Sequence, residues 1–147
     1  MFTIYNLSVL IHVLGIALGV GSATVKLLLL SKCRSNYDFF YTYFKVSKLI
    51  TQLIVMGIIL MTLSGIAFLI MGYPFKMLLI LKLILVGMIW VLGPIIDNVV
   101  EPKLEKLIPV RGQAFSPAFS KIHKQHLALE ITATLLMYLI TIIGVLL

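Results

Sequence analysis

The sequence predicts an all-α integral membrane protein, folded as an antiparallel (up-down-up-down) four-helix bundle. The 147-residue chain is 61% hydrophobic and only 12% charged, a composition typical of membrane proteins rather than of soluble cores. Apolar runs that are long enough to cross a bilayer recur four times. The connections are short enough to make sequential spans antiparallel neighbours. We expect a single domain, 1–147, with spans at about 4–30, 46–71, 75–98 and 123–147.

The first span contains no charged side chain from Met1 to Val25, yet it contains a histidine. Ionisable groups within the bilayer are costly and usually face the protein interior. One helical face carries residues spaced by three and four positions: His12, Gly15, Gly19, Ser22 and Lys26. The GxxxG spacing of its two glycines allows another backbone, or a flat ligand, to approach closely.

The connection at 31–44 is basic and carries an aromatic cluster, which we interpret as a belt at the membrane interface. The cluster consists of Tyr37, Phe39, Phe40, Tyr41, Tyr43 and Phe44. The second span follows, and no residue is charged from Leu49 to Phe75. A tight turn at 72–74 then leads into the third span.

The third span contains Lys82 and Pro94. Pro94 is expected to kink the helix because its ring frees the carbonyl of Trp90. The long connection at 99–122 contains three prolines. Its first part, up to Leu107, is expected to continue the third helix, and the remainder is expected to be loop.

The net charge of +7 does not indicate nucleic-acid binding, because the basic residues lie in the connections between apolar spans. The first and third connections contain most of them. The positive-inside rule therefore predicts a protein of the cell membrane with both termini outside. Cys33 is the only cysteine, which excludes an intrachain disulfide and a thiolate metal cluster.

Depth predicts a common site for two buried polar groups. His12 lies eight residues into the first span and Lys82 eight residues beyond Pro74, each roughly 12 Å below the outer surface. His12 could hydrogen-bond across helices or serve as an axial haem ligand. Lys82 could extend its ammonium to the surface, or pair with a haem propionate or a carboxylated substrate.

A second set of polar groups is expected at the cytoplasmic end. Its members are Lys26, Asp97, His123, His126 and Glu130. The two histidines and Glu130 can share one face of the fourth helix. We predict that Lys26 or Arg111 pairs with Asp97 or Glu130. Two interpretations remain open, namely charges that fix helix packing, and a divalent-metal site or proton path.

Several segments resemble a superfamily that includes HemJ-type protoporphyrinogen oxidases and the membrane part of copper-resistance protein D (CopD). IHVLGIALGVGSA at 11–23 resembles its first helix, although Gly19 and Ser22 replace the usual tryptophan and second glycine. MTLSGIAFLI at 61–70, LLILKLILVGMIW at 78–90 and VVEPKLEKL at 99–107 are similar to later segments. The resemblance implies haem b held through His12, with Lys82 at the haem or substrate site.

The leading functional hypothesis is a haem-b-binding redox protein that exchanges electrons with the quinone pool or a partner, with protoporphyrinogen oxidation as its most specific form. Its expected residues are His12 as haem-iron ligand, Gly15 and Gly19 as further cofactor contacts and Lys82 as the catalytic residue. His126 and Glu130 are secondary candidates. The alternatives are a non-catalytic subunit of a larger respiratory-type complex and a small-ion or metal transporter. Besides the lipid bilayer, the expected partners are a quinone or porphyrin and further copies or subunits.

Overall fold

The computed structural model describes residues 3–33, 36–74, 76–110 and 113–147, and this part of the chain contains helices but no strand. Its elements are α1 (Ile4–Lys32), α2 (Tyr37–Ile70), α3 (Met77–Ile95), the π-helical turn η1 (Ile96–Val100), α4 (Glu101–Glu105) and α5 (Pro117–Leu146). Helices α3, η1 and α4 follow one another without a break. Four helical segments are thus long and apolar enough to cross a membrane, which confirms the all-α class and the expected number of long apolar helices in the described part of the chain.

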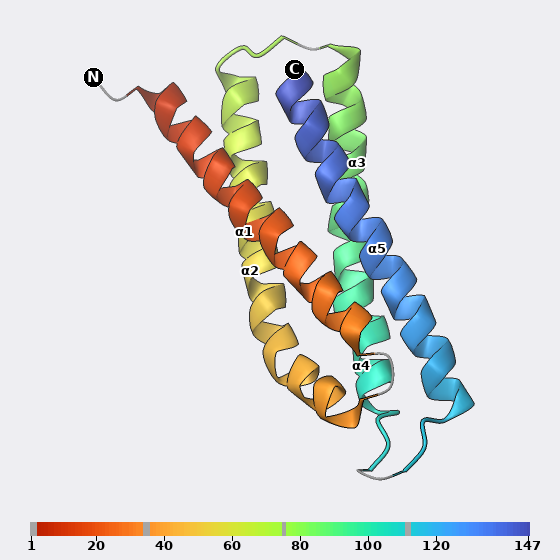
Figure 1. Cartoon of the computed structure of the whole chain (residues 1–147). Helices are drawn as coiled ribbons and strands as arrows, with labels where there is room; N and C mark the ends of the chain where they lie inside the picture. The colour runs from red at the N-terminus through yellow and green to blue at the C-terminus, as the bar shows by residue number, and fades with distance from the viewer. Residues whose placement is uncertain (1–2, 34–35, 75, 111–112) are drawn as a thin grey trace.

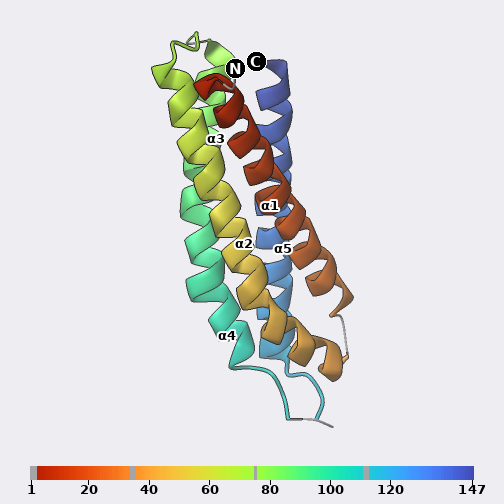
Figure 2. The ribbon, with the colours of Figure 1, turned by 90° about the vertical axis from the view of Figure 1, so that its left-hand side faces the viewer.

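The four long helices run antiparallel to one another in chain order (Figure 1). Both chain termini and the connection between α2 and α3 lie at one end, called here the terminal end; the other two connections lie at the opposite end, called here the loop end. Figure 2 shows the same division from the side. The closest helix pairs are α1 with α2, α3 with α5, and α1 with α5.

Two helices begin earlier than the sequence predicted. Helix α2 begins at Tyr37 rather than near 46, because the Asn36 side chain caps it by accepting a hydrogen bond from the Asp38 amide at 3.1 Å. Helix α5 begins at Pro117 rather than at 123. The Ser116 hydroxyl accepts a hydrogen bond from a backbone amide of its first turn, and proline is favourable at this first position.

The third span does not end at Pro94. The helix passes instead into the π-helical turn η1, with the Asn98 side chain donating to the Pro94 carbonyl at 3.1 Å. A π-helical turn is one way in which a helix absorbs a local disruption of its hydrogen bonds. The helix then continues as α4, so the expected extension beyond the span is confirmed to Glu105.

Helices α1 and α2 pack backbone to backbone through three glycines. A Cβ on Gly15 would lie 2.9 Å from the Gly57 carbonyl oxygen, and a Cβ on Gly57 would collide with the backbone of Gly19. The groove formed by Gly15 and Gly19 is therefore filled by α2. Small residues permit this close approach where a bilayer gives no hydrophobic driving force between helices.

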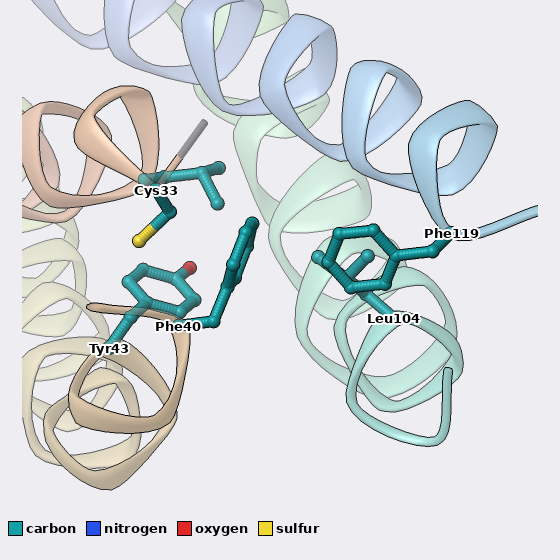
Figure 3. Close-up of a cluster of buried hydrophobic side chains, with 6 residues drawn as sticks. Cys33, Phe40, Tyr43, Leu104 and Phe119 are labelled. Carbon is teal, nitrogen blue, oxygen red and sulfur yellow. The ribbon is translucent and has the colours of Figure 1, made fainter. Parts of the chain in front are cut away.

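The loop end contains a hydrophobic core to which α1, α2, α4 and α5 contribute (Figure 3). It consists of Leu30, Cys33, Phe40, Tyr43, Leu104 and Phe119. Phe40 and Tyr43 are fully buried, whereas Phe39 and Tyr41 are exposed. The predicted aromatic belt is therefore wrong for Phe40 and Tyr43, because the early start of α2 turns these two side chains inward.

Candidate functional site

A cavity of about 380 Å³ lies at the terminal end, between α1, α2, α3 and α5. Its wall is mostly apolar. Among the polar side chains on it are His12, Thr62, Lys82 and Thr141. Pockets for small organic ligands span about 300–1,000 Å³ and combine apolar walls with a few polar groups. The cavity is therefore of a size and character suited to an organic ligand.

The side chain of His12 is held in one tautomer by α2. Its Nδ1 atom lies 2.8 Å from the Ser64 hydroxyl oxygen, and the Ser64 hydroxyl donates its own hydrogen to the Leu60 carbonyl at 2.7 Å. Because that hydrogen is already used, Ser64 accepts from His12, and Nδ1 carries the proton. The Nε2 atom consequently keeps its lone pair, the arrangement found in metal-binding histidines.

Lys82 reaches across the cavity from α3 to α5. A Cβ on Gly144 would lie 2.8 Å from the Lys82 ammonium nitrogen, so the side chain occupies the space that the missing Gly144 side chain leaves. Among the described residues, no carboxylate forms an ion pair with Lys82. Its positive charge is thus available to a carboxylate of a bound ligand.

The structure places His12 and Lys82 on one cavity, as their equal depth predicted. The two glycines expected beside a cofactor lie elsewhere. Gly15 and Gly19 face the backbone of α2 and do not line the cavity. The sequence allowed either another helix or a flat ligand to pack against these two glycines, and in the structure α2 packs against them.

A second constellation lies in the loop-end half of the bundle, around the buried ammonium of Lys26. Its nitrogen lies 2.8 Å from Asp97 Oδ1, 2.8 Å from Glu101 Oε2 and 2.9 Å from Glu130 Oε1. It also donates to the Thr51 hydroxyl at 3.0 Å. The predicted pairing of Lys26 with Asp97 or Glu130 is therefore confirmed for both carboxylates, whereas Arg111 lies outside the described residues.

Two histidines of α5 adjoin this cluster. The side chain of His126 is fully buried, and its Nε2 atom lies 3.4 Å from Glu130 Oε1, one helical turn away. His123 is also buried, and its ring stacks on Phe119 and meets the edge of Phe40. His126 thus has a ring nitrogen within ion-pair distance of a carboxylate, and His123 packs against aromatic rings.

Two partners in these sites were not predicted from the sequence. Glu101 lies four residues after Asp97 on the helix that was expected to continue beyond the third span, but its pairing with Lys26 was not predicted. Ser64 orients His12. In the sequence it is only one polar residue in an apolar span, and nothing there indicates this role.

Searches of family models, curated proteins and solved structures find no match for this chain.

Proposed function

We propose that the protein is an integral membrane redox protein that binds haem b in the terminal-end cavity. One observation carries the proposal: His12 Nδ1 lies 2.8 Å from a Ser64 hydroxyl that itself donates to the Leu60 carbonyl. We infer from it that Nδ1 carries the proton and that Nε2 can ligate iron. Haem proteins often use such an imidazole, and a hydrogen bond to its other nitrogen orients the ring and raises its basicity. When bound, haem would supply one-electron redox chemistry.

The other residues of the cavity suit this group. The Lys82 ammonium would hold a propionate or the carboxylate of a porphyrin substrate. The apolar side chains of the wall exclude water, which strengthens that ionic contact. Met61 and Met137 also line the cavity, and their thioethers are available as a second iron ligand.

The most specific form of this function is protoporphyrinogen oxidation, the activity of the HemJ-type enzymes that the sequence resembles. Lys82 would then be the catalytic residue that binds substrate. A quinone or a partner protein in the same membrane would receive the electrons.

Absorption spectroscopy of the purified protein, expressed with added haem, tests the proposal. The wild type should show a Soret band and the sharp reduced α-band of a low-spin b-type centre. His12→Ala should remove both bands, because alanine offers iron no donor atom. Lys82→Ala should keep them and either shift the midpoint potential or abolish turnover, because it removes a positive charge near the ring edge.

Lys76→Ala is the matched control, since Lys76 is exposed at the start of α3, and it should change neither spectrum nor potential. Wild-type protein that is well folded yet colourless would contradict the haem proposal. So would a His12→Ala variant with an unchanged spectrum.

A second candidate is a non-catalytic subunit of a larger membrane complex. The ion pairs of Lys26 favour it, because they tie α1 to the third and fourth spans and so fix helix packing without any ligand. Native mass spectrometry tests this function. The protein is expressed in the cells from which it comes and is purified from their membranes in mild detergent. Stable association with other chains and the absence of haem would support it, and a colourless monomer would oppose it.

The transporter hypothesis has less support. Gly144, which adjoins Lys82, and Glu130 are separated on α5 by fourteen residues, about 21 Å along the helix axis. A relay from His12 and Lys82 to Glu130 would have to cross this largely apolar distance.

A further inference from the structure

The cluster around Lys26 contains more negative than positive charge. Three carboxylates, those of Asp97, Glu101 and Glu130, surround one ammonium. The exposed fraction is 1% for Lys26 and 5% for the Glu130 side chain. Buried charges are costly unless they are balanced, so the ionised cluster would carry two uncompensated negative charges in a site with little water.

A buried imidazole points into the same cluster without a hydrogen bond. His126 is 0% exposed, and its Nε2 atom is directed at the Glu130 carboxylate. Among the described residues, neither ring nitrogen of His126 makes a hydrogen bond. The Tyr43 hydroxyl, beside His126 in the core, is likewise buried without a hydrogen-bond partner in the described part of the chain. Native proteins rarely leave such groups unsatisfied, and an unseen ion is one explanation.

We propose that Glu101, His126 and Glu130 bind one divalent transition-metal cation, with Zn²⁺ as the best match. One potential ligand atom from each of these residues lies within 4.8 Å of those of the other two. Ligand atoms on one zinc ion lie about 2.0–2.2 Å from it, so small side-chain rotations would close the site. The two α5 ligands are one helical turn apart, and Glu101 comes from α4.

The charges then balance. One divalent cation and the Lys26 ammonium together neutralise the three carboxylates. Each carboxylate has two oxygens, so Glu101 and Glu130 can contact Lys26 and the metal at the same time. Lys26 would therefore stay in place and hold the carboxylates in position.

The kind of metal follows from the ligands. An imidazole with two carboxylates suits zinc and neighbouring transition metals, whereas magnesium and calcium prefer ligand sets composed entirely of oxygen. The side chain of Glu101 is 13% exposed and that of Asp97 is 24% exposed. The site can therefore be reached past these two residues. This proposal is independent of haem, which would bind at the other end of the bundle.

The experiment uses the full chain, free of any affinity tag, purified in detergent without added haem. Zinc is titrated by calorimetry, and bound metal is counted by elemental analysis after dialysis. We expect one zinc per chain and a rise in the thermal unfolding temperature with zinc but not with magnesium. His126→Gln should raise the dissociation constant at least tenfold, since losing even an outer-shell partner of a metal ligand costs about 10–100-fold.

Gln125→Ala is the matched control, because Gln125 is exposed and adjoins His126 on α5, and it should leave zinc affinity unchanged. If His126→Gln fails to fold, a second test uses the wild-type protein loaded with Co²⁺. Its visible spectrum should show the intense d–d bands of four-coordinate cobalt. Wild-type protein that retains no zinc and shows no such bands would overturn the proposal. Zinc affinity that is unchanged in folded His126→Gln would also overturn it.

Discussion

The ammonium of Lys26 in α1 donates a hydrogen bond of 2.8 Å to Asp97 Oδ1 in η1, across 71 residues of sequence. The same nitrogen contacts carboxylates of α4 and α5 and the Thr51 hydroxyl of α2. One side chain thereby connects all four spanning segments in the loop-end half of the bundle. The fold and the charge balance of this region both depend on it.

Removal of this ammonium should destabilise the protein strongly. Lys26→Met leaves three buried carboxylates without their cation, and breaking a buried ion pair typically costs about 3–5 kcal/mol. Thermal unfolding in detergent should show a large loss of stability. Lys76→Met, which changes an exposed lysine, should have little effect, and equal losses in the two variants would contradict the assigned role of Lys26.

Glu130→Gln should lower yield and thermal stability more than it changes any haem spectrum. The substitution removes one charge of the Lys26 cluster, whereas the terminal-end cavity is not lined by Glu130. Absorption spectra and unfolding curves of the same preparation provide the comparison. A spectral change larger than that of His12→Ala would place the cofactor at the loop end.

The contact between α1 and α2 should not tolerate a side chain at Gly57. In Gly57→Ala the new Cβ meets the backbone of Gly19, and overpacking of this kind typically costs about 1–3 kcal/mol. Gly65→Ala lies on the same helix with no atom near its Cβ, so it should be neutral or stabilising. Similar unfolding temperatures for the two variants would argue against the close packing of the glycines.

The tautomer of His12 can be tested without any ligand. Nitrogen NMR of protein labelled at histidine should show His12 protonated at Nδ1 in the wild type. Ser64→Ala removes the acceptor of that proton and should shift the tautomer equilibrium. Ser47→Ala, a buried serine in the other half of α2, should leave the His12 signals unchanged; a wild-type signal from the Nε2–H tautomer would refute the assignment.

The Cys33 thiol should react slowly with alkylating reagents. It lies just after α1, and burial raises its pKa to about 11. Because the thiolate is the reactive form, alkylation of the folded protein should increase as the pH rises toward 11. Iodoacetamide labelling followed by mass spectrometry measures this dependence. Since Cys33 is the only cysteine, detergent-denatured protein is a direct control and should react readily near pH 9; fast labelling of the folded protein at pH 7 would contradict its burial.

Much of the architecture could be predicted from the sequence because length and hydrophobicity determine a membrane span. A helix rises about 1.5 Å per residue, so depth could be counted along each span. That count was enough to put His12 level with Lys82, and Lys26 level with Asp97 and Glu130. The pairing of Lys26 with a carboxylate could then be predicted, because a buried ammonium inside a helix bundle needs a negatively charged partner.

The rotation of each helix and the choice of its neighbour were decided only by the tertiary structure. Lipid-facing and interior positions are both apolar, so hydrophobicity could not show that Gly15 and Gly19 receive α2 instead of a ligand. Nor could it show that Phe40 turns into the core while Phe39 remains exposed. Such choices depend on the shapes of side chains from distant segments, as with Gly57 against Gly19. The partnership of Glu101 with Lys26 likewise depends on how the helix beyond Pro94 is rotated, because that rotation directs the Glu101 carboxylate at the ammonium.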